Sequence, residues 1–415
     1  MRQRREELRV RLTEFVLAAI DGSRELSDDE LRDLIEQSIR AHTKELALSV
    51  QERLTGRRDV FHALRGLDVL QDMMDDPEIT EIMVNGPDDI FYEKDGELFR
   101  SEARFSGEQK LADVIQKIAA GVNRAVNEAN PIVDARLPDG SRVNVVLPPV
   151  SLVGPAVTIR KFPKERITME RLIELESISP EAAAQLQTLV KAGYNIFVSG
   201  GTGSGKTTML NALSDAIPAD ERVVTIEDSA ELQLSGIPNL VRLEMRNANA
   251  EGNRAITIRD LIKTSLRMRP SRIVVGEVRD AASIDMLQSL NTGHNGMSTG
   301  HANSPADMLS RIETMTLLGE EIPLLAVRKQ IAAAIEIIIQ LGRLRDKTRK
   351  VLEITEIVAC VDGEIELNPL FVFREVGETA DGRILGELRP TGNRLKRQGK
   401  LQAAGLRLPE TLEVV

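Results

Sequence analysis

The sequence has one cysteine and few aromatic residues, and both shortages exclude classes of protein. Cys360 stands alone among 415 residues, which excludes an intramolecular disulfide bond and any metal site built from several cysteines. There is no tryptophan and there are two tyrosines, so aromatic platforms that stack nucleic-acid bases are not expected. No apolar run approaches the roughly 20 residues that span a bilayer. These features are typical of a protein of a reducing cytosol.

The charge balance is acidic, with a net charge of −10. This balance argues against broad nucleic-acid binding, which depends on basic side chains. The N-terminal stretch MRQRREELRVRL is too charged for a secretory signal peptide. A chain of 415 residues exceeds one ordinary hydrophobic core, so two or three domains are expected.

The first 162 residues predict two different kinds of structure. Residues 1–65 carry apolar residues at helical spacing, and Ser27 with Glu30 forms a capping box. This extension is either a docking arm or a solvated helical segment. Residues 66–162 predict a small α+β domain, with strands at 81–84, 90–93, 98–100, 143–147 and 157–160 and a helix over 107–127. Residues 163–178 predict a linker with one short helix. Residues 179–415 predict the largest domain, which includes a late antiparallel hairpin around Asp362-Gly363.

Residues 179–415 contain a glycine-rich loop near their start. A short apolar strand ending at Ser199 leads into Gly200-x-x-x-x-Gly205-Lys206-Thr207, a complete phosphate-binding loop. Glycine amides and a helix N-terminus cradle phosphate oxygens, Lys206 can reach the outer phosphates, and the Thr207 hydroxyl can bind Mg²⁺. We therefore expect ATP and Mg²⁺ at the loop residues Gly200, Gly201, Thr202, Gly203, Ser204, Gly205, Lys206, Thr207 and Thr208.

Strands and helices alternate after this loop, which predicts a largely parallel sheet covered on both faces. The predicted strands are 196–199, 223–227, 240–243, 273–276 and 297–300. Three polar clusters follow strand ends: Glu227 to Glu231, Glu277 to Asp280, and the segment between His294 and His301. Carboxylates just past a buried strand are costly unless they meet a cation or an activated water. A zinc site at the two histidines is disfavoured, because no third ligand lies nearby in sequence.

With these motifs in place, the chain resembles the secretion and pilus-assembly ATPases of type II and type IV systems. It resembles most closely the CpaF/TadA branch that serves tight-adherence (Flp) pili. The resemblance covers roughly residue 67 to the C-terminus and rests on LPDGSRVNVVLPP (137–149), GGTGSGKTT (200–208), RVVTIEDSAELQL (222–234), LRMRPSRIVVGEVRDAASIDMLQSLNTGH (266–294) and HANSPADMLSRIETM (301–315).

The resemblance implies a hexameric ATPase with a RecA-like motor domain and a PAS-like N-terminal domain. It assigns hydrolysis to Glu231 and Glu277, with Glu227 in reserve, and it lets Glu277 hold Mg²⁺ directly or through water. Charge stabilisation would come from Lys206, Arg142, Arg160 and His301. The implied partner is an inner-membrane platform protein, which would place the motor at the cytoplasmic face of that membrane.

Several alternatives stay open at this level. The same fold could serve a motor that translocates nucleic acid, or a module that senses nucleotide without turnover. Without the resemblance, Arg142 and Arg160 read as ordinary surface arginines. The basic tail 383–408 predicts a helix that is either a solvated cap or a contact with the membrane platform.

Overall fold

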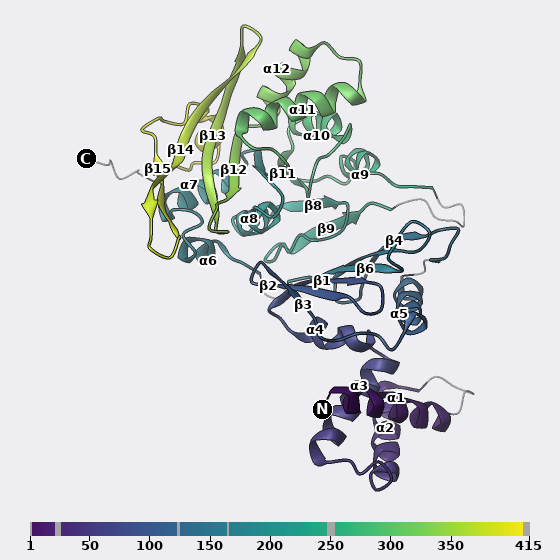
Figure 1. The fold of residues 1–415 in the computed structure, drawn as a ribbon. Coiled ribbons are helices and arrows are strands. Elements are labelled where there is room, and N and C mark those ends of the chain that lie inside the picture. Colours follow the sequence, from purple (N-terminus) through teal and green to yellow (C-terminus); the bar gives the residue numbers. More distant parts are fainter. Residues whose placement is uncertain (1, 21–25, 123–124, 164–165, 247–253, 410–415) are drawn as a thin grey trace. The chain divides into compact units, whose positions relative to one another are not determined.

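The computed structural model describes every residue except 1, 21–25, 123–124, 164–165, 247–253 and 410–415. The chain divides into two compact units, residues 1–164 and 165–415 (Figure 1). The predicted boundary at 65/66 inside the first unit stays a prediction. Within the predicted linker, the short helix α6 (Met169–Glu174) buries Met169 and Leu172 in the core of the second unit.

Three helices begin the first unit: α1 (Arg2–Ala19), α2 (Asp28–His42) and α3 (Val50–Leu64). The predicted capping box at Ser27 and Glu30 is confirmed, and Ser49 with Glu52 forms a second one at α3. The three helices share a small apolar core that includes Leu12, Val16, Leu31, Ile35, Ile39 and Val60. A buried ion pair between Arg9 and Asp68 connects α1 to the 3₁₀ helix η1 (Asp68–Leu70).

The rest of the first unit is an antiparallel sheet with helices, as the sequence predicts. Its strands run in the order β3-β2-β1-β6-β5-β4 among the described residues. The elements are α4 (Gln71–Asp75), β1 (Ile79–Asn85), β2 (Ile90–Lys94), β3 (Glu97–Arg100), α5 (Glu108–Gly121), β4 (Ile132–Arg136), β5 (Arg142–Val146) and β6 (Ala156–Arg160). The prediction missed β4 and extended the helix α5 too far, because α5 ends at Gly121.

The second unit is built on a nine-stranded sheet, counted over the described residues, in the order β15-β14-β13-β12-β7-β11-β10-β8-β9. All five predicted strands are confirmed, as β7 (Ile196–Gly200), β8 (Arg222–Glu227), β9 (Asn239–Glu244), β10 (Arg272–Val275) and β11 (Asn295–Gly300). These five strands and β12 (Ile337–Arg343) are parallel. Their carboxyl ends therefore meet at one edge of the sheet, where ligands bind in such folds.

Helices cover both faces of this parallel sheet. On one face, α6, α7 (Pro180–Lys191) and α8 (Lys206–Ser214) pack on apolar residues such as Val198 and Ile339. On the other face, α9 (Ile258–Ser265), α10 (Ala282–Asn291), α11 (Pro305–Gly319) and α12 (Leu324–Ala334) pack on Phe197, Ile273 and Ile338. Burial on both faces explains why these strands read as continuous apolar runs.

The C-terminal part corrects one prediction. The predicted hairpin is confirmed as β13 (Arg349–Val361) and β14 (Glu364–Glu378), but the tail predicted as helix forms the strand β15 (Ile384–Pro390) before the short helix α13 (Gly399–Ala403). Ile384 and Leu388 are both buried, and a spacing of four puts two side chains on one face of either a helix or a strand. Residues 384–390 form a strand because they pair with β14.

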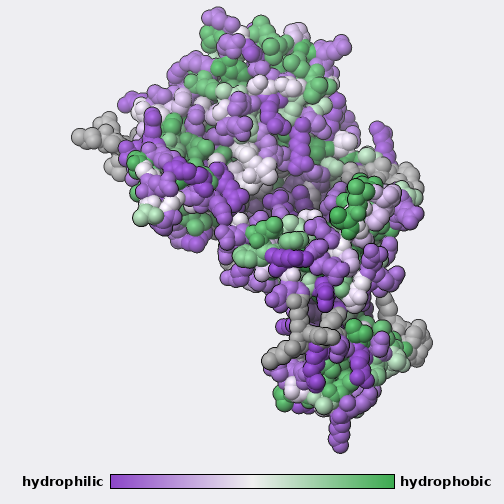
Figure 2. All heavy atoms as spheres, in the orientation of Figure 1, coloured by the Kyte–Doolittle hydropathy of each residue, from purple (hydrophilic) through white to green (hydrophobic). Residues whose placement is uncertain are grey.

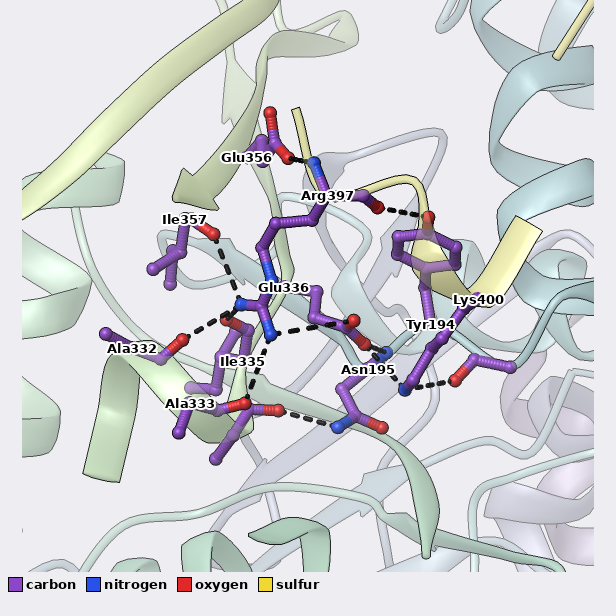
Figure 3. Close-up of polar contacts among 12 residues, drawn as sticks. Tyr194, Asn195, Ala332, Ala333, Ile335, Glu336, Glu356, Ile357, Arg397 and Lys400 are labelled. Carbon is purple, nitrogen blue, oxygen red and sulfur yellow. Dashed lines mark hydrogen bonds and ion pairs between the residues drawn. The ribbon is translucent and has the colours of Figure 1, made fainter. Parts of the chain in front are cut away.

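Two of the basic residues after β15, Arg397 and Lys400, are partly buried, whereas Arg394, Lys396 and Arg407 are exposed as a solvated cap would be. Figure 3 shows Arg397 and Lys400 reaching buried carboxylates and backbone carbonyls. Lys400 Nζ lies 2.7 Å from Glu336 Oε2, and the Arg397 amide donates to Glu356 Oε1 at 2.6 Å. Glu336 also accepts from the amide of Asn195, directly before β7. The C-terminal segment therefore fastens the amino end of the strand that carries the glycine loop.

The surface of the second unit combines charged residues with a few exposed leucines. Hydrophobic residues gather on the visible face over α11 and α12 (Figure 2). The exposed large apolar side chains there include Leu317, Leu318, Leu324 and Leu325. Among the residues that the structure describes, no helix is both long enough and apolar enough to cross a bilayer.

Candidate nucleotide site

The glycine loop adopts the geometry that its sequence predicts. Gly203 and Gly205 have positive φ values of 68° and 95°, which side chains rarely tolerate. A Cβ on Gly200 would lie 2.5 Å from Ser204 Oγ, whereas Gly201 and Gly203 face open space. The loop therefore closes on its own backbone on one side and is open to a ligand on the other, with the N-terminus of α8 beside it.

Lys206 is folded back onto this loop. Its ammonium donates to the carbonyl oxygens of Gly200 and Gly201 at 3.2 and 3.0 Å, and its side chain is buried. The same Nζ lies 3.2 Å from Nδ1 of His301. His301 Nε2 in turn lies 3.2 Å from Glu277 Oε1. Lys206, His301 and Glu277 therefore form one continuous polar line beside the loop: Lys206 begins α8, and His301 and Glu277 follow the neighbouring strands β11 and β10.

The electrostatics of this line keep its carboxylate charged. Burial raises the pKa of the Glu277 carboxyl, but the hydrogen bond and charge of Arg279, with His301 and Lys206, outweigh burial and lower that pKa. Arg279 Nη2 donates to Glu277 Oε2 at 2.8 Å, and Arg279 Nη1 lies 3.4 Å from Asp228 Oδ2. Burial, followed by the charge of Lys206, lowers the pKa of His301, so its imidazole is neutral at neutral pH.

Glu227 is buried at the end of β8 and binds backbone amides of the turn that follows. It is 3% exposed, and its Oε2 accepts the amides of Glu231 and Leu232, both at 2.7 Å. Burial raises the pKa of Glu227, although these two hydrogen bonds oppose that shift. Glu227 therefore shapes the turn that presents the half-buried Glu231. A Cβ on Gly276 would lie 3.1 Å from Glu227 Cγ, which explains why glycine precedes Glu277.

The two histidines of the third cluster are not brought together. His301 follows the carboxyl end of β11 and reaches Lys206, whereas His294 precedes the amino end and contacts the Ser289 carbonyl at 3.1 Å. The whole strand β11 separates them. Within the described residues there is also no group of three or more acids, histidines or cysteines that could hold a metal.

Arg142 and Arg160 lie in the first unit, next to each other. Arg142 begins β5 and pairs in register with Arg160 at the end of β6, and Arg136 of β4 pairs with Arg142 from the other side. Residues paired in register point to the same face, so three arginines share one row of the sheet. Arg160 Nε lies 3.7 Å from Glu81 Oε1. Contact of Arg142 and Arg160 with a nucleotide stays a prediction.

Two residues beside the loop were not predicted. Arg349 of β13 donates from Nε to the Gly203 carbonyl at 2.8 Å. Gln340 of β12 donates to the carbonyl of Ala302, the residue after His301, at 3.1 Å. Both lie more than a hundred residues after the loop in sequence, and the pairing of β12 with β7 and of β13 with β12 brings them near.

A phosphate-binding loop at the carboxyl edge of a parallel sheet, with acids and a histidine on neighbouring strand ends, defines a RecA-like nucleotide-binding protein. The matching family model, described as type II/IV secretion system protein, covers residues 64–381. The chain belongs to this family.

Relatives of the chain carry names from secretion and conjugation. A Mycobacterium tuberculosis protein whose name assigns it provisionally to conjugal transfer is 37% identical, over 73% of this chain and 88% of its own length. The type IV secretion system protein PtlH of Bordetella pertussis is 32% identical, over 67% and 89%. The Legionella pneumophila ATPase DotB, at 22% identity, superposes with a TM-score of 0.50 over 70% of this chain and 79% of its own. The predicted α/β fold class with a RecA-like motor domain is thereby confirmed.

Proposed function

We propose that this chain is an ATPase that hydrolyses ATP to ADP and phosphate. The observation that carries the proposal is the line from Lys206 through His301 to Glu277 beside an open glycine loop. A buried ammonium, a neutral imidazole and a charged carboxylate beside the glycine loop suit a ligand that combines negative charge with an attacking water.

The loop residues fit a triphosphate and its magnesium ion. Open space borders Gly201 and Gly203 where a Cβ would stand. The backbone amides of the loop, the ammonium of Lys206 and the N-terminus of α8 would supply the positive environment that phosphates need. Mg²⁺ is held in such sites by few carboxylates together with phosphate oxygens and waters. The Thr207 hydroxyl and Glu277, directly or through water, are the protein groups proposed for it. When bound, the ion would neutralise part of the charge on the phosphates.

In this proposal the carboxylates divide the work. Glu231 orients the attacking water and accepts its proton as the new bond to the γ-phosphorus forms and the bond to the ADP oxygen breaks. Glu277 stays charged beside Arg279 and His301. Lys206 offsets the charge on the phosphoryl group as it is transferred to water. Arg142 and Arg160 of the first unit add positive charge to the same phosphates.

The roles proposed for Glu231 and Glu277 predict a large loss of activity when either carboxylate is neutralised. We expect Glu231→Gln and Glu277→Gln to lower kcat by at least about 100-fold each, because each removes a charge needed in the transition state but little volume. Steady-state phosphate release measures this effect. Glu174→Gln, at an exposed residue of α6 that forms an ion pair with Arg171, is the matched control and should keep the wild-type rate. Wild-type rates in both test variants would contradict the assignment.

We further propose that the motor powers a type IV pilus of the tight-adherence (Flp) kind, or protein secretion, as a hexamer at the cytoplasmic face of the inner membrane. The support is the family, the motif resemblance, and relatives named for type IV secretion and conjugal transfer. An inner-membrane platform protein is the proposed partner.

The subunit number is directly testable. We expect native mass spectrometry of the full chain with a nonhydrolysable ATP analogue and Mg²⁺ to give a six-subunit mass, because the arginines of one subunit would complete the site of another. A variant with both Arg142→Ala and Arg160→Ala should weaken this assembly in the presence of nucleotide. A monomer under all these conditions would contradict the hexamer but not the ATPase proposal.

A further inference from the structure

Gln340 is a buried polar residue on β12, close to the glycine loop. It is 3% exposed, and its Nε2 donates to the carbonyl oxygens of Ala302 at 3.1 Å and of Leu341 at 3.2 Å. These two acceptors fix the orientation of the amide, because the reversed orientation would bring its oxygen against two carbonyl oxygens. The side chain therefore acts as a donor toward the segment that follows His301.

The strand register places Gln340 where three chain segments meet. Gln340 pairs with Ser199 of β7, the residue before the glycine loop, and Ser199 pairs on its other side with Gly300 of β11. His301 and Ala302 follow Gly300 directly. A Cβ on Gly300 would lie 2.9 Å from Phe197 Cε1 and from Met308 Cε, so β11 has no room for a side chain there. One amide group thus spans from β12 past β7 to the end of β11.

Folding stability alone does not explain why position 340 carries an amide. In the described part of the chain, Gln340 Oε1 and Ser199 Oγ are both buried without a hydrogen-bond partner. A buried polar group without a partner costs about 1–3 kcal/mol. An apolar side chain of similar length would remove the cost at Gln340, and the surrounding side chains on this face, such as Ile338 and Met308, are apolar. The position therefore carries an amide for a reason other than packing.

We propose that Gln340 is a positioning residue of the nucleotide site: by holding the carbonyl of Ala302, it keeps His301 between Lys206 and Glu277. The inference rests on the proposed ATPase function. β12 continues into β13, whose Arg349 donates to Gly203 of the loop. The same pair of strands thus fixes both sides of the site, the loop through Arg349 and the histidine through Gln340.

The test replaces Gln340 with methionine, which keeps the length and removes the amide. We expect kcat to fall about 10- to 100-fold with KM changed less than about twofold, since the reacting groups are misplaced and the loop is intact. In a His301→Ala background, Gln340→Met should lower kcat less than about twofold further, because the two residues act as one unit. The thermal midpoint should stay or rise.

A spectroscopic measurement separates positioning from general damage. The chain has four histidines, so selective histidine labelling gives few NMR signals. Gln340→Met should shift the His301 signal at fixed pH without nucleotide and leave those of His42, His62 and His294 in place. Gln330→Met is the matched control, because Gln330 on α12 also has a buried Oε1 without a partner among the described residues. It should change neither kcat nor the His301 signal.

The outcomes distinguish this inference from the function on which it rests. If the wild-type chain hydrolyses ATP while Gln340→Met leaves kcat and the His301 signal unchanged, the positioning role is wrong and the ATPase proposal stands. Additive losses in the His301→Ala background would also overturn the role. If the wild-type chain releases no phosphate, the ATPase proposal fails, and a shifted His301 signal would still support the contact.

Discussion

Lys206→Ala should reduce ATP hydrolysis by at least about 1000-fold, close to background. The ammonium contributes twice, because it neutralises phosphate charge and because it donates to the Gly200 and Gly201 carbonyls that form the loop. Alanine removes both contributions and leaves His301 without the adjacent ammonium, whereas Arg279 still pairs with Glu277. Phosphate release under steady-state conditions measures the loss of turnover.

A second measurement shows whether nucleotide still binds. Millimolar ATP with Mg²⁺ should raise the thermal midpoint of the wild-type chain and raise that of Lys206→Ala less, since stabilisation of the folded state by a ligand increases with the logarithm of its concentration relative to Kd. Lys329→Ala, at an exposed lysine of α12, is the control and should behave as wild type. A Lys206→Ala protein that hydrolysed ATP at the wild-type rate would refute the site.

Glu221→Leu should destabilise the second unit by about 3–5 kcal/mol, the largest stability effect expected here. Arg272 at the start of β10 is 0% exposed, and its Nε and Nη2 each lie 2.9 Å from an oxygen of Glu221. Without Glu221, a guanidinium that cannot lose its proton stays buried without its counter-ion. Equilibrium urea denaturation followed by circular dichroism measures the loss.

The partner variants sharpen this prediction. Arg272→Met should cost less than Glu221→Leu, because the remaining carboxylate is 15% exposed and can reach water. The double variant should regain much of the stability, since an apolar pair replaces an ion pair. Arg171→Met, which removes an exposed pair with Glu174, should cost less than about 1 kcal/mol. Equal small effects in all four proteins would show that the buried pair contributes little.

The strands of the second unit follow from the sequence because each apolar run is bounded by turn residues. The two strands that the sequence did not predict, β4 and β12, lack such clear bounds. Asp134 and Ala135 in β4 are poor strand formers, and pairing with β5 holds them in place. The apolar run 333–341 contains both the end of α12 and most of β12, and a continuous apolar run does not distinguish helix from strand.

The loop and its acids were predictable because short motifs encode them. The sequence also grouped His294 with His301, but it could not show that a full strand separates them until the strand bounds were known. Arg349 and Gln340 carry no local signal, because their roles arise from strand pairing across more than a hundred residues. Whether Arg142 and Arg160 reach a nucleotide depends on how subunits and units assemble, which a motif does not encode.

The contacts of Arg397 and Lys400 with buried glutamates have a consequence for biosynthesis. Glu336 and Glu356 are buried. Lys400 pairs with Glu336, and the amides of Lys396 and Arg397 donate to Glu356. The first unit has its own core and can form early, whereas the second unit lacks these contacts until residues 396–400 have been made. A nascent chain arrested before residue 396 would leave both carboxylates buried without these partners, and the amino end of β7 would be held less firmly.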